Sequence, residues 1–147
     1  MAQGSLFGAG ARSFVANIDG ASRGNPGPAA AGWVIRDASD SQVLVEEGLC
    51  LGTETNNRAE YFALLFALED AVLLRAAELL VRSDSELLVK QMAGEYRVKN
   101  RDLKPLFTRA KRLASAFKRF RMEHVPRAQN TDADRVANEA LDAQKKK

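Results

Sequence analysis

The chain is poor in residues that form cross-links and in large aromatic residues, since its 147 residues include one cysteine, one histidine and one tryptophan. The single cysteine, Cys50, excludes an intrachain disulfide and a thiolate zinc cluster, because both need more than one thiol. No apolar run reaches the roughly 18 residues of a transmembrane helix. Residues 1–13 also lack the apolar core of a secretory signal. The default expectation is a cytoplasmic protein without a membrane span.

The length and composition are those of one globular domain. Hydrophobic residues make up 46% of the chain, which argues against disorder. The length suffices for one domain with a core, but not comfortably for two. We expect residues 1–12, which are rich in Gly and Ala, to form a loose lead-in. Residues 13–143 should form the domain, and residues 144–147 a basic tail.

Positive charge is concentrated in one part of the chain. Residues 97–121 hold ten of the 22 Lys and Arg residues but only one of the 19 acids, Asp102, which gives this block a net charge of +9. The rest of the chain carries −6. A basic block beside an acidic body indicates a polyanionic partner. The alternative is an ordinary solvated helix face.

The spacing of hydrophobic residues predicts five strands and four helices in the order βββαβααβα. Strands are expected over residues 13–19, 31–37, 42–51, 79–83 and 120–125, helices over 56–77, 85–92, 103–117 and 131–143, and a loop over 20–28. Short connections between the first three strands predict antiparallel pairing, and the later alternation of strand and helix predicts parallel pairing. The fold class is therefore α/β, with a five-stranded mixed sheet flanked by helices. The helix over 56–77 is apolar nearly all round, so we expect it to be deeply buried.

Four acids fall at the ends of predicted elements. Asp19 closes the first strand and Asp84 follows the fourth, while Glu60 and Asp134 lie near the starts of two helices. Each also has a local explanation, because acids suit turns and the first turns of helices. If the four converge, divalent cations would relieve their repulsion, and oxygen ligands favour Mg²⁺ or Mn²⁺. Two such ions could stabilise the attacking and leaving oxygens of phosphodiester cleavage.

Sequence motifs surround all four acids. They are DGAS, GNPGP and GW within residues 19–33, TNNRAE at 55–60, SDS at 83–85, and NxxADxxA at 130–137. In this order they resemble the motifs of type 1 ribonucleases H, and the resemblance covers residues 14–141. It implies the ribonuclease H fold and hydrolysis of the RNA strand of RNA–DNA hybrids, which leaves 3′-hydroxyl and 5′-phosphate ends. It also implies that Asp19, Glu60, Asp84 and Asp134 hold two Mg²⁺ or Mn²⁺ ions.

The resemblance also implies how the hybrid is bound. Proteins distinguish RNA from DNA by the 2′-hydroxyls, which are reached across the shallow minor groove. The residues expected to contact nucleic acid are Gly20, Asn25, Thr55, Asn56, Asn57 and Arg58. Thr55 and Asn56 are also candidates for binding a DNA phosphate near a helix N-terminus. Alternatively, Thr55 and Asn57 are only helix caps.

The sequence lacks the tryptophan-rich basic protrusion, called the handle, that many ribonucleases H carry. Residues 94–103 lead almost directly into the next predicted helix, which is typical of the handle-less members. We expect Arg97, Lys99 and Arg101 to replace the handle in binding nucleic acid. The alternative is that Arg109, Lys111 and Arg112 do so from the helix.

Two further positions depart from the family pattern. Glu86 stands where the family often has Gln, so an acid would lie near the phosphates. The segment before Asp134 is too short for the mobile loop in which many members carry a catalytic histidine. His124 falls within the alternating pattern of the last predicted strand rather than in a mobile loop. We therefore expect Arg127, and not His124, to lie at the edge of the catalytic site, as in handle-less relatives with a Val-Pro-Arg segment.

Two other functions fit the same fold. One is a catalytically inactive module that binds hybrids or double-stranded RNA, but it would be marked by a missing carboxylate, and none is missing. The other is a different nuclease, such as a Holliday-junction resolvase or DEDD exonuclease, against which the GNPG and TNNR segments argue. Double-stranded RNA is a second candidate substrate. No obligate protein partner is implied.

Overall fold

The computed structural model describes residues 12–145. The predicted lead-in over residues 1–11 and the last two residues of the predicted tail therefore lie outside the described residues. The elements are β1 (Ser13–Ser22), β2 (Gly27–Asp37), β3 (Val43–Glu54), α2 (Asn56–Leu73), β4 (Glu78–Ser83), α3 (Glu86–Met92), α4 (Lys104–Ala114), β5 (Arg119–His124), the short 3₁₀ helix η1 (Arg127–Gln129) and α5 (Thr131–Lys145). The predicted order of strands and helices is confirmed.

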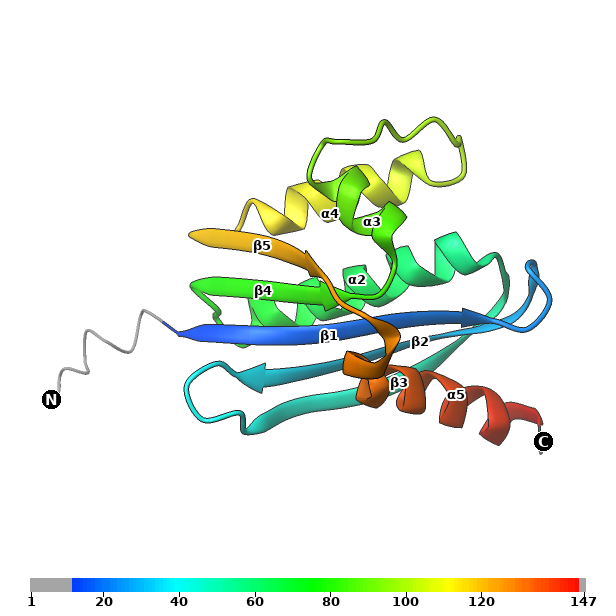
Figure 1. The fold of residues 1–147 in the computed structure, drawn as a ribbon, viewed down its shortest axis with the longest axis horizontal. Coiled ribbons are helices and arrows are strands. Elements are labelled where there is room, and N and C mark those ends of the chain that lie inside the picture. The colour runs from blue at the N-terminus through cyan, green and yellow to red at the C-terminus, as the bar shows by residue number, and fades with distance from the viewer. Residues whose placement is uncertain (1–11, 146–147) are drawn as a thin grey trace, which may run out of the picture.

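The five strands form one mixed sheet in the order β3-β2-β1-β4-β5 (Figure 1). β2 pairs antiparallel with both β1 and β3. β4 pairs parallel with both β1 and β5. This arrangement confirms the predicted fold class, and it brings the carboxyl ends of β1 and β4 to the same edge of the sheet.

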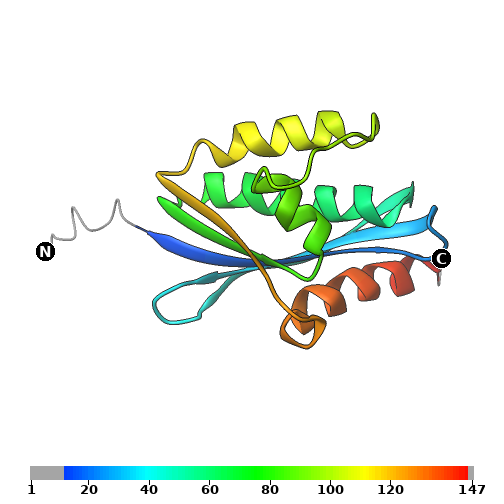
Figure 2. The ribbon, with the colours of Figure 1, turned by 45° about the horizontal axis from the view of Figure 1, so that its top comes forward.

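Helices cover both faces of the sheet. α2, α3 and α4 lie on one face, and α5 lies on the other (Figure 2). The larger core forms between the sheet and α2, where Phe14, Ile18, Tyr61, Leu64 and Leu68 are almost completely buried. Removal of this apolar surface from water is the main force that holds α2 on the sheet. No helix within residues 12–145 is long and apolar enough to cross a membrane.

The first hairpin differs from the prediction, because the expected loop over residues 20–28 is mostly strand. β1 continues through Ser22 and β2 begins at Gly27, since Gly20 to Ser22 pair with Ala29 to Ala31. The connecting loop is therefore only residues 23–26. Glycine weakens a strand without preventing its pairing, and Pro28 lies beside the first residue of its strand, where proline is tolerated.

The predicted burial of the longest helix is confirmed, but its predicted end is wrong. α2 stops at Leu73 because Arg75 adopts a left-handed conformation, with a φ of 61°. The Ala76 N–H then donates to the Ala71 carbonyl, which closes the last turn. At this end the helix leaves the core, and Leu73 is 78% exposed.

Other boundaries differ by a few residues. α4 covers Lys104–Ala114 rather than residues 103–117, and Phe117 leaves the helix to stack on Phe120. α5 continues to Lys145, so residues 144 and 145 belong to the helix instead of a tail. Such shifts are common, because the ends of helices depend on tertiary contacts.

Candidate active site

Three carboxylates meet at the sheet edge where β1 and β4 end. Asp19, Glu60 and Asp84 each place one carboxylate oxygen within 4.8 Å of the others. Asp134 lines the same cleft, and its carboxylate is close enough to Asp19 to raise the pKa of that acid. The structure thus brings together all four acids that the sequence singled out, although Asp134 stands slightly apart from the group of three.

Glycines on either side of Asp19 let two helices approach the strands closely. A Cβ atom at Gly20 would lie 2.3 Å from the Ala59 carbonyl carbon, so α2 rests on the backbone of β1. Gly32 pairs with Asp19 across the sheet, and a Cβ atom there would lie 2.2 Å from the Ala133 carbonyl oxygen of α5. These contacts hold Glu60 and Asp134, each the next residue in its helix, beside Asp19.

Burial and mutual repulsion disfavour the charged forms of these acids. Burial, and then the carboxylates of Asp84 and Asp134, raise the pKa of Asp19 from 3.8 to about 8. Burial, and then Asp19 and Asp84, raise the pKa of Glu60 well above its usual 4.5. Burial also raises the pKa of Asp84, against the opposing charge of Arg127. Negative charge is therefore crowded and only partly compensated by the protein.

This donor set fits a divalent metal. The Oε2 atom of Glu60 is buried and has no hydrogen-bond partner among residues 12–145. A buried polar atom without a partner is unfavourable, and a cation at this position would satisfy it. All the donors are oxygens, which suits a hard cation. The group formed by Asp19, Glu60 and Asp84 can therefore bind a divalent metal ion.

Arg127 and His124 lie on the same side of the site. The Arg127 guanidinium lines the cleft, 3.7 Å from the Asp134 carboxylate, and its side chain is 80% exposed. His124 lies in the last strand, as predicted, and is the exposed last residue of β5. Its imidazole is not part of the cleft wall, but it lies close enough to lower the pKa of Asp84 slightly. The geometry gives Arg127 direct access to the cleft.

The rim of the cleft is built by the loop over residues 23–26 and the start of α2. The Asn25 carboxamide oxygen accepts a hydrogen bond from the Asn56 N–H. Thr55 is the cap of α2, because its hydroxyl accepts from the Arg58 N–H. Asn56 and Asn57 are exposed and line the cleft, so capping does not explain Asn57.

Two residues of the cleft wall, Arg23 and Asn138, were not singled out from the sequence. The Arg23 guanidinium donates to both Asn138 and Asp142 of α5, which ties the 23–26 loop to that helix. Asn138 donates to the Asp134 carboxylate. The four-residue spacing from Asp134 would have indicated Asn138, because such residues are neighbours on a helix surface. Nothing local indicates the partners of Arg23.

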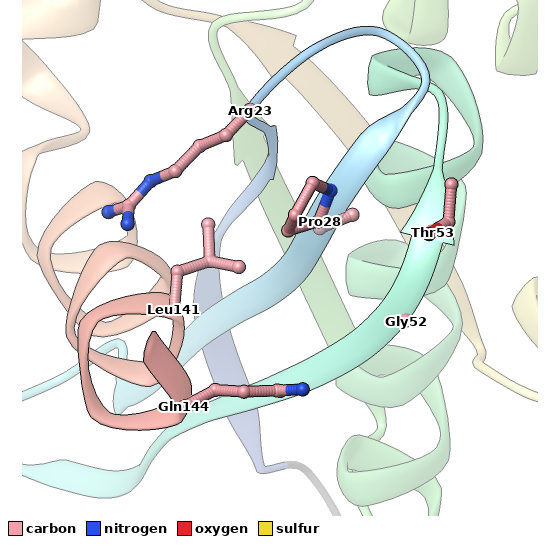
Figure 3. Close-up of a pocket in the computed structure, with 7 residues that line it drawn as sticks. Arg23, Pro28, Gly52, Thr53, Leu141 and Gln144 are labelled. Atoms are coloured by element: carbon pink, nitrogen blue, oxygen red, sulfur yellow. The ribbon is translucent and has the colours of Figure 1, made fainter. Parts of the chain in front are cut away.

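A second pocket lies beside the cleft, between the ends of β2, β3 and α5 (Figure 3). Its volume is about 450 Å³, and Leu141 projects into it from α5. Arg23 lines both this pocket and the cleft. Among the residues that the structure describes, no acid lines the second pocket. The acidic cleft, of about 490 Å³, is therefore the candidate active site.

The basic loop, which carries Arg97, Lys99 and Arg101, lies between α3 and α4, beside the start of α2. The Arg58 guanidinium donates to the Asp102 carbonyl oxygen over 2.6 Å and pairs with Glu54, which anchors this loop to the rim. Arg97, Lys99 and Arg101 are exposed. Within residues 12–145 none of the three forms an ion pair, so their charges are available to a ligand.

The basic residues of α4 are the alternative to the basic loop, and two of them already make contacts within the protein. Arg109 pairs with Glu69, and the Lys111 ammonium donates to the Met92 carbonyl oxygen.

Glu86 is exposed and pairs with Lys90 over 3.4 Å, which offsets part of its charge.

Comparison with known proteins identifies the family. Residues 17–140 match the family described as reverse transcriptase-like. A bifunctional protein of Mycobacterium tuberculosis is 52% identical over 88% of this chain and 35% of its own length, and a ribonuclease HI of Halobacterium salinarum is 46% identical over 86% and 63%. The chain thus spans about a third of the mycobacterial relative it matches.

Solved structures agree with the sequence relatives. The N-terminal ribonuclease H domain of the mycobacterial protein superposes with a TM-score of 0.88 at 50% identity, covering 90% of this chain and 96% of that domain. The halobacterial enzyme gives 0.86 at 45% identity, covering 89% and 98%. LC11-RNase H1, solved with an RNA/DNA hybrid, gives 0.84 at 40% identity over the same shares. This chain therefore belongs to the type 1 ribonuclease H family.

Proposed function

We propose that this chain is a metal-dependent endonuclease that hydrolyses the RNA strand of RNA–DNA hybrids, leaving 3′-hydroxyl and 5′-phosphate ends. Residues 13–143 would form its catalytic domain. The observation that carries the proposal is the group of Asp19, Glu60 and Asp84, with a buried oxygen of Glu60 that lacks a partner. The likeness to LC11-RNase H1, which was solved with a hybrid, supports the choice of substrate.

Two Mg²⁺ or Mn²⁺ ions would be held by Asp19, Glu60, Asp84 and Asp134. When bound, such ions stabilise the attacking and leaving oxygens of phosphodiester hydrolysis. The protein's part is to hold the carboxylates together before substrate arrives. Close backbone packing at Gly20 and Gly32 achieves this, because preorganised charges need no rearrangement during the reaction.

The rim would select a hybrid over other duplexes. Asn56 and Asn57 present amide groups at the cleft, and Asn25 lies on its rim against the Asn56 N–H. From there the three residues would bond to RNA 2′-hydroxyls and base edges. Gly20 lines the cleft, where its backbone would contact the substrate. Thr55 and Asn56 would bind a DNA phosphate from the start of α2, where helix N–H groups favour anions, and Arg58 beside them would contact the nucleic acid.

A cleavage assay tests this proposal. Labelled RNA–DNA hybrid, double-stranded RNA and DNA duplex are each incubated with Mg²⁺, Mn²⁺ or EDTA. We expect cleavage of the RNA strand of the hybrid with either cation and none with EDTA. Binding of the hybrid without cleavage would favour an inactive binding module, and cleavage of DNA would favour another nuclease. The double-stranded RNA arm shows whether that duplex is a second substrate.

Arg127 should contribute to the rate more than His124 does. Arg127→Ala should lower kcat roughly 100-fold, because a fixed positive charge at the cleft is removed. His124→Ala should change kcat less than about threefold, since its ring does not line the cleft. Steady-state rates on one hybrid measure the effect of each substitution. Arg127→Lys tests whether a positive charge alone is sufficient. A larger loss from His124→Ala would reverse the assignment.

The basic loop should supply affinity rather than chemistry. Alanine at Arg97, Lys99 and Arg101 should weaken binding of the hybrid and flatten the plot of log affinity against log salt, by up to roughly 0.9 per lost phosphate contact. The kcat should change little, because uniform binding is removed. The parallel triple at Arg109, Lys111 and Arg112 serves as the matched comparison. An unchanged slope in the loop variant would exclude the loop as the substitute handle.

A further inference from the structure

A buried pair of asparagines links strand β1 to the start of α5. Asn17 is 7% exposed and Asn130 is 1% exposed. The Asn17 amide nitrogen donates to the Asn130 side-chain oxygen over 3.0 Å and lies 3.4 Å from the Gln129 carbonyl oxygen. The Asn130 amide nitrogen donates to the Ile18 carbonyl oxygen over 2.8 Å. The two side chains thus form one connected set of hydrogen bonds.

These hydrogen bonds join β1, which carries Asp19, to the segment that carries Arg127 and Asp134. Asn17 precedes Asp19 by two residues, so both side chains project from the same face of the sheet. The Asn130 N–H donates to the Arg127 carbonyl oxygen, and its own carbonyl oxygen accepts from the Asp134 N–H. All four hydrogen-bonding groups of Asn130 are therefore used, and they connect the strand of Asp19 with Arg127 and Asp134.

An asparagine would be unusual at position 17 if the only role of its side chain were to fill space in the interior. Burial of a polar group is unfavourable unless its hydrogen bonds are made. The buried apolar side chains of β1, those of Phe14, Ala16 and Ile18, lie on the opposite face, and the other buried polar residue of the strand is Asp19. Asn17 instead faces η1, which Arg82 of β4 also holds by donating to the Gln129 side chain. The polar contacts specify where η1 lies, which an apolar contact would do less well.

We infer that Asn17 is a positioning residue, which fixes η1 and the start of α5 on β1 and thereby sets Arg127 and Asp134 relative to Asp19. The inference rests on the proposed function, because it takes Asp134 as a metal ligand and Arg127 as a group that faces the substrate. Asn17 itself does not line the cleft, so it acts through Asn130.

The test substitutes Asn17→Leu, which keeps the branched shape of the side chain and removes the donor. Mn²⁺ binding is measured by calorimetry without substrate, and kcat and KM are measured on a hybrid. Affinity for Mn²⁺ and kcat should each fall about tenfold or more, as when groups that orient metal ligands are removed. The KM for the hybrid should stay within about twofold, because the rim and the basic loop are untouched. If the Leu variant does not fold, Asn17→Ser provides the same measurements with a smaller disturbance.

Trp33→Phe is the matched control. It removes another partly buried hydrogen bond, from the Trp33 indole to Asp70, ten residues beyond Glu60 along α2. It should lower the melting temperature without changing Mn²⁺ affinity or kcat. If Asn17→Leu behaves as this control does, Asn17 is only structural and the inference is overturned. Failure of the proposed function would be seen separately, as an unsubstituted protein that neither binds Mn²⁺ nor cuts the hybrid, and it would overturn both.

Discussion

Replacing Asp19, Glu60 or Asp84 by its amide should lower kcat for hybrid cleavage on the order of 10³-fold or more, while the fold stays intact. Each amide keeps the shape of the side chain but removes one negative charge from the group of three. Cations would then bind weakly or in the wrong place. Asp134→Asn should be milder, because Asp134 stands apart from that group and an amide oxygen can still bind a metal.

Initial rates at saturating hybrid and cation, together with circular dichroism, measure this effect. Asp40→Asn, an equivalent change in the turn between β2 and β3, is the control and should retain full activity. The two-metal proposal would be wrong if a folded Asp19→Asn protein cut the hybrid at a near-normal rate.

Divalent cations should raise the melting temperature, and more strongly at pH 8 than at pH 6. The pKa of Asp19 is about 8 in the folded protein without metal and near 3.8 when unfolded. Between these values the folded state binds more protons, so stability without metal falls as the pH rises from about 4 to about 8. A cation that binds only the folded state reverses this loss, and protons compete with it less at high pH.

Thermal unfolding with and without Mn²⁺ across this pH range checks the expectation. At about 100 times Kd the cation should raise the melting temperature by roughly 5–10 °C. The Asp19→Asn/Asp84→Asn double variant should show no such increase and a flatter dependence on pH. An unchanged melting temperature at saturating Mn²⁺ would argue against a site that is formed before metal binds.

The sequence predicted the fold, and it predicted that four acids lie at neighbouring ends of strands and helices, because both depend on local patterns. Alternating residues mark the strands, and element ends mark Asp19, Glu60, Asp84 and Asp134. The extension of β1 through Gly20 was missed, because pairing with Ala31 of β2 outweighs the weak strand preference of glycine. The end of α2 was missed because a single residue, Arg75, adopts a left-handed conformation.

The supporting residues of the site were less predictable because their partners are far away in sequence. Asn17 is separated by 113 residues from Asn130, and in an alternating strand it resembles a surface position. Arg23 is separated by 119 residues from Asp142. No local pattern contains such pairs. Long-range contacts, rather than propensities, decide which polar side chains are buried.

The glycine contacts around Asp19 have a consequence for how the sequence can diverge. In most of the core, helices touch the sheet through side chains, so a change of side-chain volume moves a helix slightly. At Gly20 and Gly32 the helices instead touch backbone atoms. The distances between the carboxylates therefore depend little on changes of side-chain volume in the rest of the core. Over evolutionary time, hydrophobic residues elsewhere in the core can change while the site keeps its dimensions, provided that these two glycines and the pair of Asn17 and Asn130 are retained.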